Sequence, residues 1–180
     1  NAEFTIPKQV VRLRILDAEM ERSFNLGFSD NRTFYVISSG GGLFDKPIAL
    51  TRLPIHVGER YEILVDCSND AVGNTFDLNA FNSGQSQSFP GGEPGTGGEF
   101  GSLLNNKTFT TLHFTVGSST AKPITTIPTA LRTNTYLTAA DATVSRTINI
   151  TNGNPGSGIP FDLDSKPFNL NTINHIVTTG

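Results

Sequence analysis

Apolar and polar residues alternate at every second position along most of the first 116 residues of this chain. Val11, Leu13 and Ile15 fall on one side of an extended backbone, and Arg12 and Arg14 fall on the other. This two-residue period is typical of a half-buried β-strand. Similar alternating or short apolar runs recur at residues 24–28, 34–37, 48–53, 61–67, 76–80 and 111–116. Glycine, asparagine and aspartate separate the runs, so the pattern predicts an all-β sandwich or barrel.

Helical patterns are nearly absent from the sequence. Single turns are predicted only at residues 17–22 and 138–142. In the second, Thr138 and Asp141 stand three positions apart, as in a capping box, where a hydroxyl and a carboxylate satisfy free backbone N–H groups. Neither segment is long enough to form a stable helix by itself.

The chain divides into three segments by composition. Residues 83–102 contain seven glycines and two prolines, which predicts a long flexible loop. A linker is predicted at residues 117–130, extended by Pro123 and Pro128. Strand-like runs resume at 146–151, 161–163 and 168–170. We therefore expect a sandwich over residues 1–116 and the opening strands of a second domain over residues 131–180.

Composition narrows the function classes that the chain can serve. It has 180 residues and a formal charge of −3, which argues against a nucleic-acid partner because such a partner requires a strongly basic face. No run approaches the roughly 20 apolar residues of a membrane span. One cysteine, Cys67, excludes an internal disulfide. The three histidines lie far apart, without an HxH, HxxxH or HExxH pattern, so no metal ligand set is predicted.

Several motifs together resemble a known family. The run VRLRILD at 11–17, followed by Arg22, is similar to the RFRILNAS segment that opens the second domain of three-domain multicopper oxidases. SGGGL at 39–43 resembles the SDGGLL motif of that family, and GERYEILVD at 58–66 resembles its PGERYDVLVDF motif. LDSKPF at 163–168 is similar to LNGKPF early in the third domain. The order and spacing of the motifs agree with the family over nearly the whole chain, with bacterial laccases, spore-coat laccases and bilirubin oxidases as the nearest type.

Three positions depart from the pattern of the family. Asp17 stands where the family usually has asparagine, Val57 where it has proline, and Cys67 where it has phenylalanine. None of these positions holds copper in the family. The departures therefore affect which subfamily the chain resembles, and not which domain of the family it resembles.

The resemblance implies a cupredoxin-like Greek-key β-sandwich with a trailing pair of strands from a following domain. It also implies that the parent protein binds copper through HxH and HCH motifs in its first and third domains. Its partners would be the flanking cupredoxin domains, together with a small aromatic substrate or a metal ion. The resemblance further implies a periplasmic or secreted location.

Each candidate site residue has a more ordinary structural interpretation. His56 precedes a turn, His113 lies on the polar face of a strand, and His175 matches no ligand motif. Cys67 continues the apolar face of its strand, as a buried small hydrophobic residue does. The glycines at 40–42 predict a turn with positive φ rather than a phosphate loop, because no helix follows. Catalytic, cofactor-binding and metal-binding residues are accordingly all predicted to be absent.

The sequence thus predicts the copper-free second domain of a multicopper oxidase plus the start of the third domain. The parent would oxidise phenols, related aromatics or a metal ion and reduce dioxygen to water. This chain alone would be inactive. In the parent it would space the neighbouring domains and line part of the substrate cleft, and residues 83–102 are a candidate rim of that cleft. The alternative is a non-catalytic secreted β-sandwich that serves as a binding or adhesion module.

Overall fold

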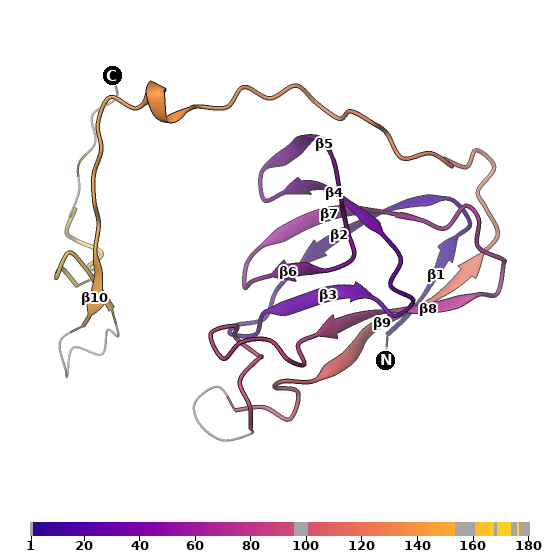
Figure 1. Ribbon diagram of the computed structural model, residues 1–180, viewed down its shortest axis with the longest axis horizontal. Coiled ribbons are helices and arrows are strands. Elements are labelled where there is room, and N and C mark those ends of the chain that lie inside the picture. Colours follow the sequence, from indigo (N-terminus) through magenta and orange to yellow (C-terminus); the bar gives the residue numbers. More distant parts are fainter. Residues whose placement is uncertain (1, 96–100, 154–160, 168, 174–175, 177–180) are drawn as a thin grey trace. The chain divides into compact units, whose positions relative to one another are not determined.

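Two β-sheets form the first structural unit of the chain, Asn1–Asn134, and Thr135–Gly180 form a second unit. The computed structural model describes residues 2–95, 101–153, 161–167, 169–173 and 176. In this part of the chain, nine strands build the first unit, with bounds β1 Ala2–Pro7, β2 Val10–Leu16, β3 Phe24–Phe28, β4 Phe34–Ser39, β5 Gly42–Leu50, β6 Leu53–Ile55, β7 Arg60–Asp66, β8 Thr75–Phe81 and β9 Thr108–Gly117. One sheet has the order β1-β9-β8-β3-β6 and the other β2-β7-β4-β5, as Figure 1 shows. The predicted all-β architecture is confirmed.

The first strand was not predicted from the sequence. β1 pairs with β9 in parallel, whereas every other strand pair of the two sheets is antiparallel. Only Ile6 of this strand is fully buried, and the preceding residues are exposed. An edge strand with so few buried positions carries little hydrophobic period, which explains why the pattern of the sequence does not reveal it.

The apolar run at residues 48–53 is divided between the two sheets. β5 ends at Leu50 in the four-stranded sheet, and β6 begins at Leu53 in the five-stranded sheet. The crossing at Thr51 and Arg52 passes close to β3, where a Cβ on Gly27 would lie 2.7 Å from the Thr51 carbonyl oxygen. A glycine is therefore required at position 27 to let the chain change sheets.

Side chains from both sheets meet in one hydrophobic core. Phe28, Phe76 and Phe114 come from the five-stranded sheet, and Phe34 comes from β4 of the other sheet. The Phe28 ring centroid lies 5.7 Å from that of Phe34 and 5.5 Å from that of Phe76, in edge-to-face arrangements. Such pairs contribute about 0.5–1.5 kcal/mol beyond their area burial. The predicted core faces of 24–28 and 61–67 are confirmed, since Leu26, Phe28, Ile63, Val65 and Cys67 are buried.

The two predicted helical turns have different outcomes. A 3-10 turn at Ala139–Asp141 is present, and the Thr138 N–H donates to the Asp141 carboxylate at 2.6 Å, as a capping box requires. Residues 17–22 form no helical turn. There the Asp17 N–H donates instead to the Glu59 carbonyl oxygen at 3.1 Å, so the chain continues alongside the turn before β7.

The second unit contains a short two-stranded sheet. β10 (Ile150–Asn152) pairs antiparallel with β11 (Phe161–Leu163), which agrees with the predicted strand at 161–163. The strand predicted at 146–151 is reduced to its end, and residues 169–170 are not a strand, while Phe168 lies outside the described residues. Many large apolar side chains of this unit are exposed, among them Ile150 and Phe161. A two-stranded sheet of this kind is at best marginally stable alone.

Residues 118–134, which include most of the predicted linker, end the first unit and pack against its four-stranded sheet; we call this segment the strap. Ile127 and Leu131 contact a small apolar cluster on the outer face of the four-stranded sheet, formed by Val10, Ile37 and Leu64. The Val10 N–H donates to the Ile124 carbonyl oxygen at 2.6 Å, and the Leu131 N–H donates to the Asp45 carbonyl oxygen at 2.8 Å. The strap is therefore docked along its length rather than free.

Replacing Ile127 with aspartate should detach the strap. The charge would enter the contact with Val10, Ile37 and Leu64 and lose its hydration there. We expect the free energy of unfolding to fall by about 1–2 kcal/mol and the Val10 amide to exchange faster. Urea unfolding and amide hydrogen exchange measure the two effects.

The control is the same substitution at Ile124, whose side chain is exposed. Ile124→Asp should leave both quantities unchanged, because only the backbone carbonyl of this residue holds the sheet. Equal Val10 exchange in the wild type and in Ile127→Asp would show that the apolar contact does not hold the strap.

Candidate functional site

The histidines predicted to be structural are held by nearby polar groups. His56 is exposed, and its Nδ1 lies 2.7 Å from the Ser23 hydroxyl oxygen, with its ring near Phe89. His113 Nδ1 lies 2.6 Å from Asp77 Oδ1 across the β8–β9 pair. His175 lies outside the described residues. The two described histidines thus belong to separate contacts, His56 just after β6 and His113 on β9.

Cys67 lies in a buried cluster next to an arginine. Its side chain is fully buried, and burial raises the pKa of the Cys67 thiol to about 12. Arg32 Nη1 lies 3.5 Å from the sulfur and donates to Asp70 at 2.8 Å, while the guanidinium stacks 3.8 Å above the Phe76 ring. A protonated thiol is a poor metal ligand and nucleophile, and Cys67 packs in the hydrophobic core between the sheets.

No group of three or more histidine, cysteine, aspartate or glutamate side chains is placed to hold a metal ion in the part of the chain that the structure describes. The described residues also include no helix that is long and apolar enough to cross a membrane.

The glycine-rich and GERY motifs meet at one turn of the four-stranded sheet. Gly40 and Gly58 have positive φ, of 23° and 78°, whereas Gly41 and Gly42 do not, so the prediction for residues 40–42 holds only at the first glycine. Glu59 accepts a bond from the His56 N–H at 2.8 Å and so satisfies an amide of the turn. Arg60 donates to the Gly58 carbonyl oxygen at 3.0 Å and to that of Gly40 at 3.4 Å.

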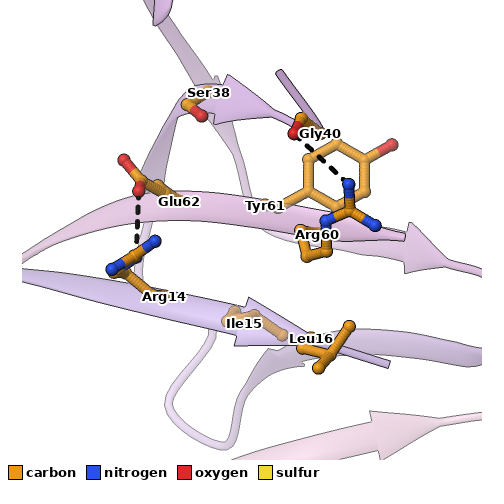
Figure 2. Close-up of a pocket in the computed structure, with 8 residues that line it drawn as sticks. All are labelled: Arg14, Ile15, Leu16, Ser38, Gly40, Arg60, Tyr61 and Glu62. Carbon is orange, nitrogen blue, oxygen red and sulfur yellow. Dashed lines mark hydrogen bonds and ion pairs between the residues drawn. The ribbon is translucent and has the colours of Figure 1, made fainter. Parts of the chain in front are cut away.

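A pocket of about 390 Å³ lies beside this turn, where β2, β7 and β4 end. Figure 2 shows Arg14 and Glu62 on one side of it and Arg60 with Gly40 on the other. Arg14 Nε lies 3.1 Å from Glu62 Oε1. The sequence places Arg14 on the polar face of a strand and Arg60 in a turn. Only the antiparallel register, in which Arg14 faces Glu62 and Leu16 faces Arg60, brings the two arginines together.

A second, mostly apolar pocket of about 360 Å³ lies at the end of the sandwich, next to Asp17. Only 2% of Asp17 is exposed, and its Oδ1 accepts the Glu19 N–H at 3.1 Å. Its Oδ2 is buried without a hydrogen-bond partner among the described residues. Burial raises the pKa of Asp17, and the neighbouring charges of Glu19 and Glu59 act in the same direction.

Residues 83–95, the longer of the two described parts of the predicted flexible loop, are tied down by hydrogen bonds. Asn82 is fully buried; it accepts the Asn25 N–H at 3.0 Å and donates to the Ser23 carbonyl oxygen at 2.8 Å. Ser23 donates its N–H to the Pro90 carbonyl oxygen at 3.0 Å. Gly91 has a φ of 93°, and a Cβ there would lie 3.0 Å from Asn82. Composition predicts such a loop but does not reveal this anchoring, because the partners lie on distant strands.

Comparison with known proteins assigns the chain to a family. A model of the multicopper oxidase family matches residues 4–93, which is half of the chain. The chain belongs to the multicopper oxidase family. The resemblance found in the sequence motifs is therefore confirmed at the level of the family.

Curated relatives match a shorter segment. The cell division protein FtsP of Xenorhabdus nematophila is 48% identical over 58 residues, which cover 32% of this chain and 12% of that protein. FtsP of Rahnella sp. is 45% identical over the same share of each chain. This chain thus matches about an eighth of the length of these relatives.

Solved structures confirm the cupredoxin-like fold of the family. The bacterial laccase-like multicopper oxidase CueO of Ochrobactrum sp. is 29% identical, with a TM-score of 0.60, over 77% of this chain and 26% of that one. McoA multicopper oxidase of Aquifex aeolicus is 23% identical, with a TM-score of 0.69, over 91% of this chain and 32% of that one. The second likeness concerns the fold alone.

Replacing Asn82 with alanine should destabilise the fold. The substitution leaves the Asn25 N–H and the Ser23 carbonyl oxygen without their side-chain partner. We expect the free energy of unfolding to fall by about 2–4 kcal/mol, because unpaired buried polar groups cost about 1–3 kcal/mol each. Urea unfolding measures this loss. Asn69→Ala, at an exposed position, is the matched control and should change little; equal stability of both variants would contradict the anchoring role of Asn82.

Replacing Asp17 with asparagine should stabilise the fold in a pH-dependent way. Burial raises the pKa of Asp17 in the folded state above its value in the unfolded state. The contribution of this carboxyl to stability is therefore complete below the unfolded pKa and is lost as the pH rises through the folded pKa. An asparagine side chain does not ionise. The variant should therefore gain about 1 kcal/mol over the wild type at pH 7 and little at pH 3.5.

Urea unfolding across this pH range tests the difference. Glu21→Gln removes one charge at an exposed position and should show no such trend. A gain for Asp17→Asn that is the same at every pH, or a loss at pH 7, would rule out an ionisation penalty at this carboxyl.

Proposed function

We propose that this chain is the copper-free middle domain of a multicopper oxidase together with the beginning of the next domain. The observation that carries the proposal is the family match at residues 4–93, in a unit whose described residues include no group suited to a metal ion. Copper would be held in the parent protein by histidine motifs outside this chain. The domains would be residues 1–116, a linker at 117–130, and residues 131–180.

The contacts of the strap support a spacing role. Asn134 donates from Nδ2 to Asp45 Oδ1 at 2.8 Å and to the Leu43 carbonyl oxygen at 3.0 Å. Thr120 donates from its N–H and its hydroxyl to Gln9 Oε1, at 3.2 and 2.7 Å. These bonds fix the strap to β5 at one end and next to β2 at the other. The chain therefore leaves the first unit from a defined place, as a domain that sets the distance between copper centres requires.

The parent reaction follows from the family. It would take electrons from a phenolic or aromatic substrate, or from a metal ion, and reduce dioxygen to water. The solved Ochrobactrum relative is described as acting on lignin model compounds, which supports a laccase-like substrate range for the parent. Residues 83–102 would form a rim of the substrate cleft. A periplasmic or secreted location agrees with this role.

A second candidate function is a role in cell division. It is favoured by the 48% identity with FtsP over 58 residues, which exceeds the 29% identity with the laccase-like oxidase. The general alternative is a non-catalytic secreted β-sandwich that serves as a binding or adhesion module.

Copper content and the flanking sequence distinguish these functions. We expect the purified chain to hold less than about 0.1 copper per molecule after incubation with copper and dialysis, since tight copper sites need several imidazole or thiolate ligands. Mass-spectrometric metal analysis measures this content. Stoichiometric copper in the chain would contradict the ligand-free assignment.

The open reading frame on both sides should encode an HxH pair upstream, and an HxH pair and an HCH motif downstream. The complete protein, loaded with copper, should consume dioxygen with a phenolic donor. If the histidine motifs are absent, the oxidase function is wrong. Accumulation of the complete protein at the division site, with filamentous growth after its depletion, would then support the division function instead of the adhesion module.

A further inference from the structure

Two arginines face a common pocket on the outer side of the four-stranded sheet, independently of any copper chemistry. In the register of β2 and β7, Arg14 is opposite Glu62 and Leu16 is opposite Arg60. Arg14 and Arg60 are therefore diagonal cross-strand neighbours, whose Cα atoms lie roughly 7–8 Å apart in such a pair. Both line the pocket of about 390 Å³, and we call it the two-arginine pocket.

This part of the surface carries an excess of positive charge. Arg12 and Arg14 share one carboxylate, that of Glu62, and Arg60 donates to backbone carbonyl oxygens, in a chain whose formal charge is −3. Both carboxylate oxygens of Glu62 are already paired, Oε2 with Arg12 and Oε1 with Arg14. Its side chain is only 14% exposed. The pocket therefore presents guanidinium groups to the solvent more than it presents this carboxylate.

Hydrogen bonds and an ion pair hold the two guanidinium groups in position without using all of their N–H donors. Arg14 uses Nε toward Glu62, with 82% of its side chain exposed. Arg60 uses one bond from each Nη, to the carbonyl oxygens of Gly58 and Gly40, as Figure 2 shows for Gly40. A guanidinium has five N–H donors, so both arginines retain donors. Side chains fixed in advance lose less conformational entropy when a ligand binds.

The remaining walls fit a ligand that is partly apolar. Leu16 is 57% exposed at the edge of the pocket, and Ser38 adds a hydroxyl near Glu62. The volume of the pocket falls within the range of small-molecule sites. A guanidinium matches the two oxygens of a carboxylate in geometry and charge.

We propose that the two-arginine pocket binds a small organic carboxylate, with its carboxylate between Arg14 and Arg60 and its apolar part against Leu16. The bound anion offsets the repulsion between the two diagonal arginines, which Glu62 relieves on one side only. The site is separate from the role of the chain as a copper-free domain and does not depend on it.

Benzoate is a suitable probe, measured on the full 180-residue chain by ¹⁵N–¹H NMR at low ionic strength, where screening is weak. We expect saturable shifts at the Arg14 and Arg60 Nε–H signals and at the Leu16 amide, with a Kd on the order of 1 mM. Benzyl alcohol, which has the ring without the charge, should cause no such shifts. Sulfate, which has charge without the ring, should bind at least about fivefold more weakly.

Variants locate the site. Arg14→Gln and Arg60→Gln should each weaken benzoate binding about fivefold or more, and Arg14→Lys should restore part of the affinity because the charge returns. Arg12→Gln is the matched control, since Arg12 also pairs with Glu62 but does not line the pocket. Arg14 is exposed, so its variants are expected to fold, and the dispersion of the amide spectrum checks this.

Three results would overturn the proposal. The first is the lack of saturable shifts up to 10 mM benzoate, used as roughly ten times the expected Kd. The second is an equal loss of affinity in Arg12→Gln, which would indicate diffuse attraction to a basic face. The third is sulfate binding as tight as that of benzoate, which would mark a general anion site without selectivity for carboxylates.

Discussion

The packing of phenylalanine rings between the two sheets is the contact on which the first unit depends. Phe28 is fully buried and touches rings from both sheets, those of Phe34 on β4 and of Phe76 and Phe114 on β8 and β9. Neither sheet has another way to bury its inner face, because the unit contains no helix among its described residues. The crossing from β5 to β6 contributes to the same packing, because it divides the apolar residues of 48–53 between the two sheets. Gly27 permits that crossing by leaving room for Thr51 and Arg52.

The outer face of the four-stranded sheet is divided between two uses. At one end the strap covers Val10, Ile37 and Leu64, which would otherwise expose apolar surface to water. At the other end the face carries arginines and the two-arginine pocket. The strap therefore contributes to the stability of the first unit. The segment that leads toward the next unit also completes the burial of apolar residues in this one. A linker docked in this way limits the directions in which the following chain can extend.

Polar residues inside the unit join chain segments through hydrogen bonds and ion pairs. Arg32 is neutralised by Asp30 and Asp70 and stacks on Phe76. Asn82 links two chain segments that lie far apart in the sequence, its own and residues 23–25. Asp17 differs, because its Oδ2 is one of the buried polar atoms without a hydrogen-bond partner among the described residues, and burial raises its pKa. An asparagine, the usual residue of the family at this position, avoids that ionisation. Membership of the multicopper oxidase family thus rests here on the β-sandwich scaffold.

Local sequence patterns were enough to define most strands, their buried faces and the family. Those features depend on a two-residue period and on short motifs, so neighbouring residues suffice to define them. The same patterns contained no sign of β1, whose edge position leaves too few buried residues to form a period. In the run 61–67, Leu64 alternates with the core residues Ile63 and Val65, and the docked strap explains why an apolar residue is suited to the outer face. The change of sheet after Leu50, the anchoring of residues 83–95 by Asn82, and the meeting of Arg14 with Arg60 became visible only in three dimensions. Each of these joins residues that are distant in sequence, and strand register and packing, which no local pattern encodes, bring them together.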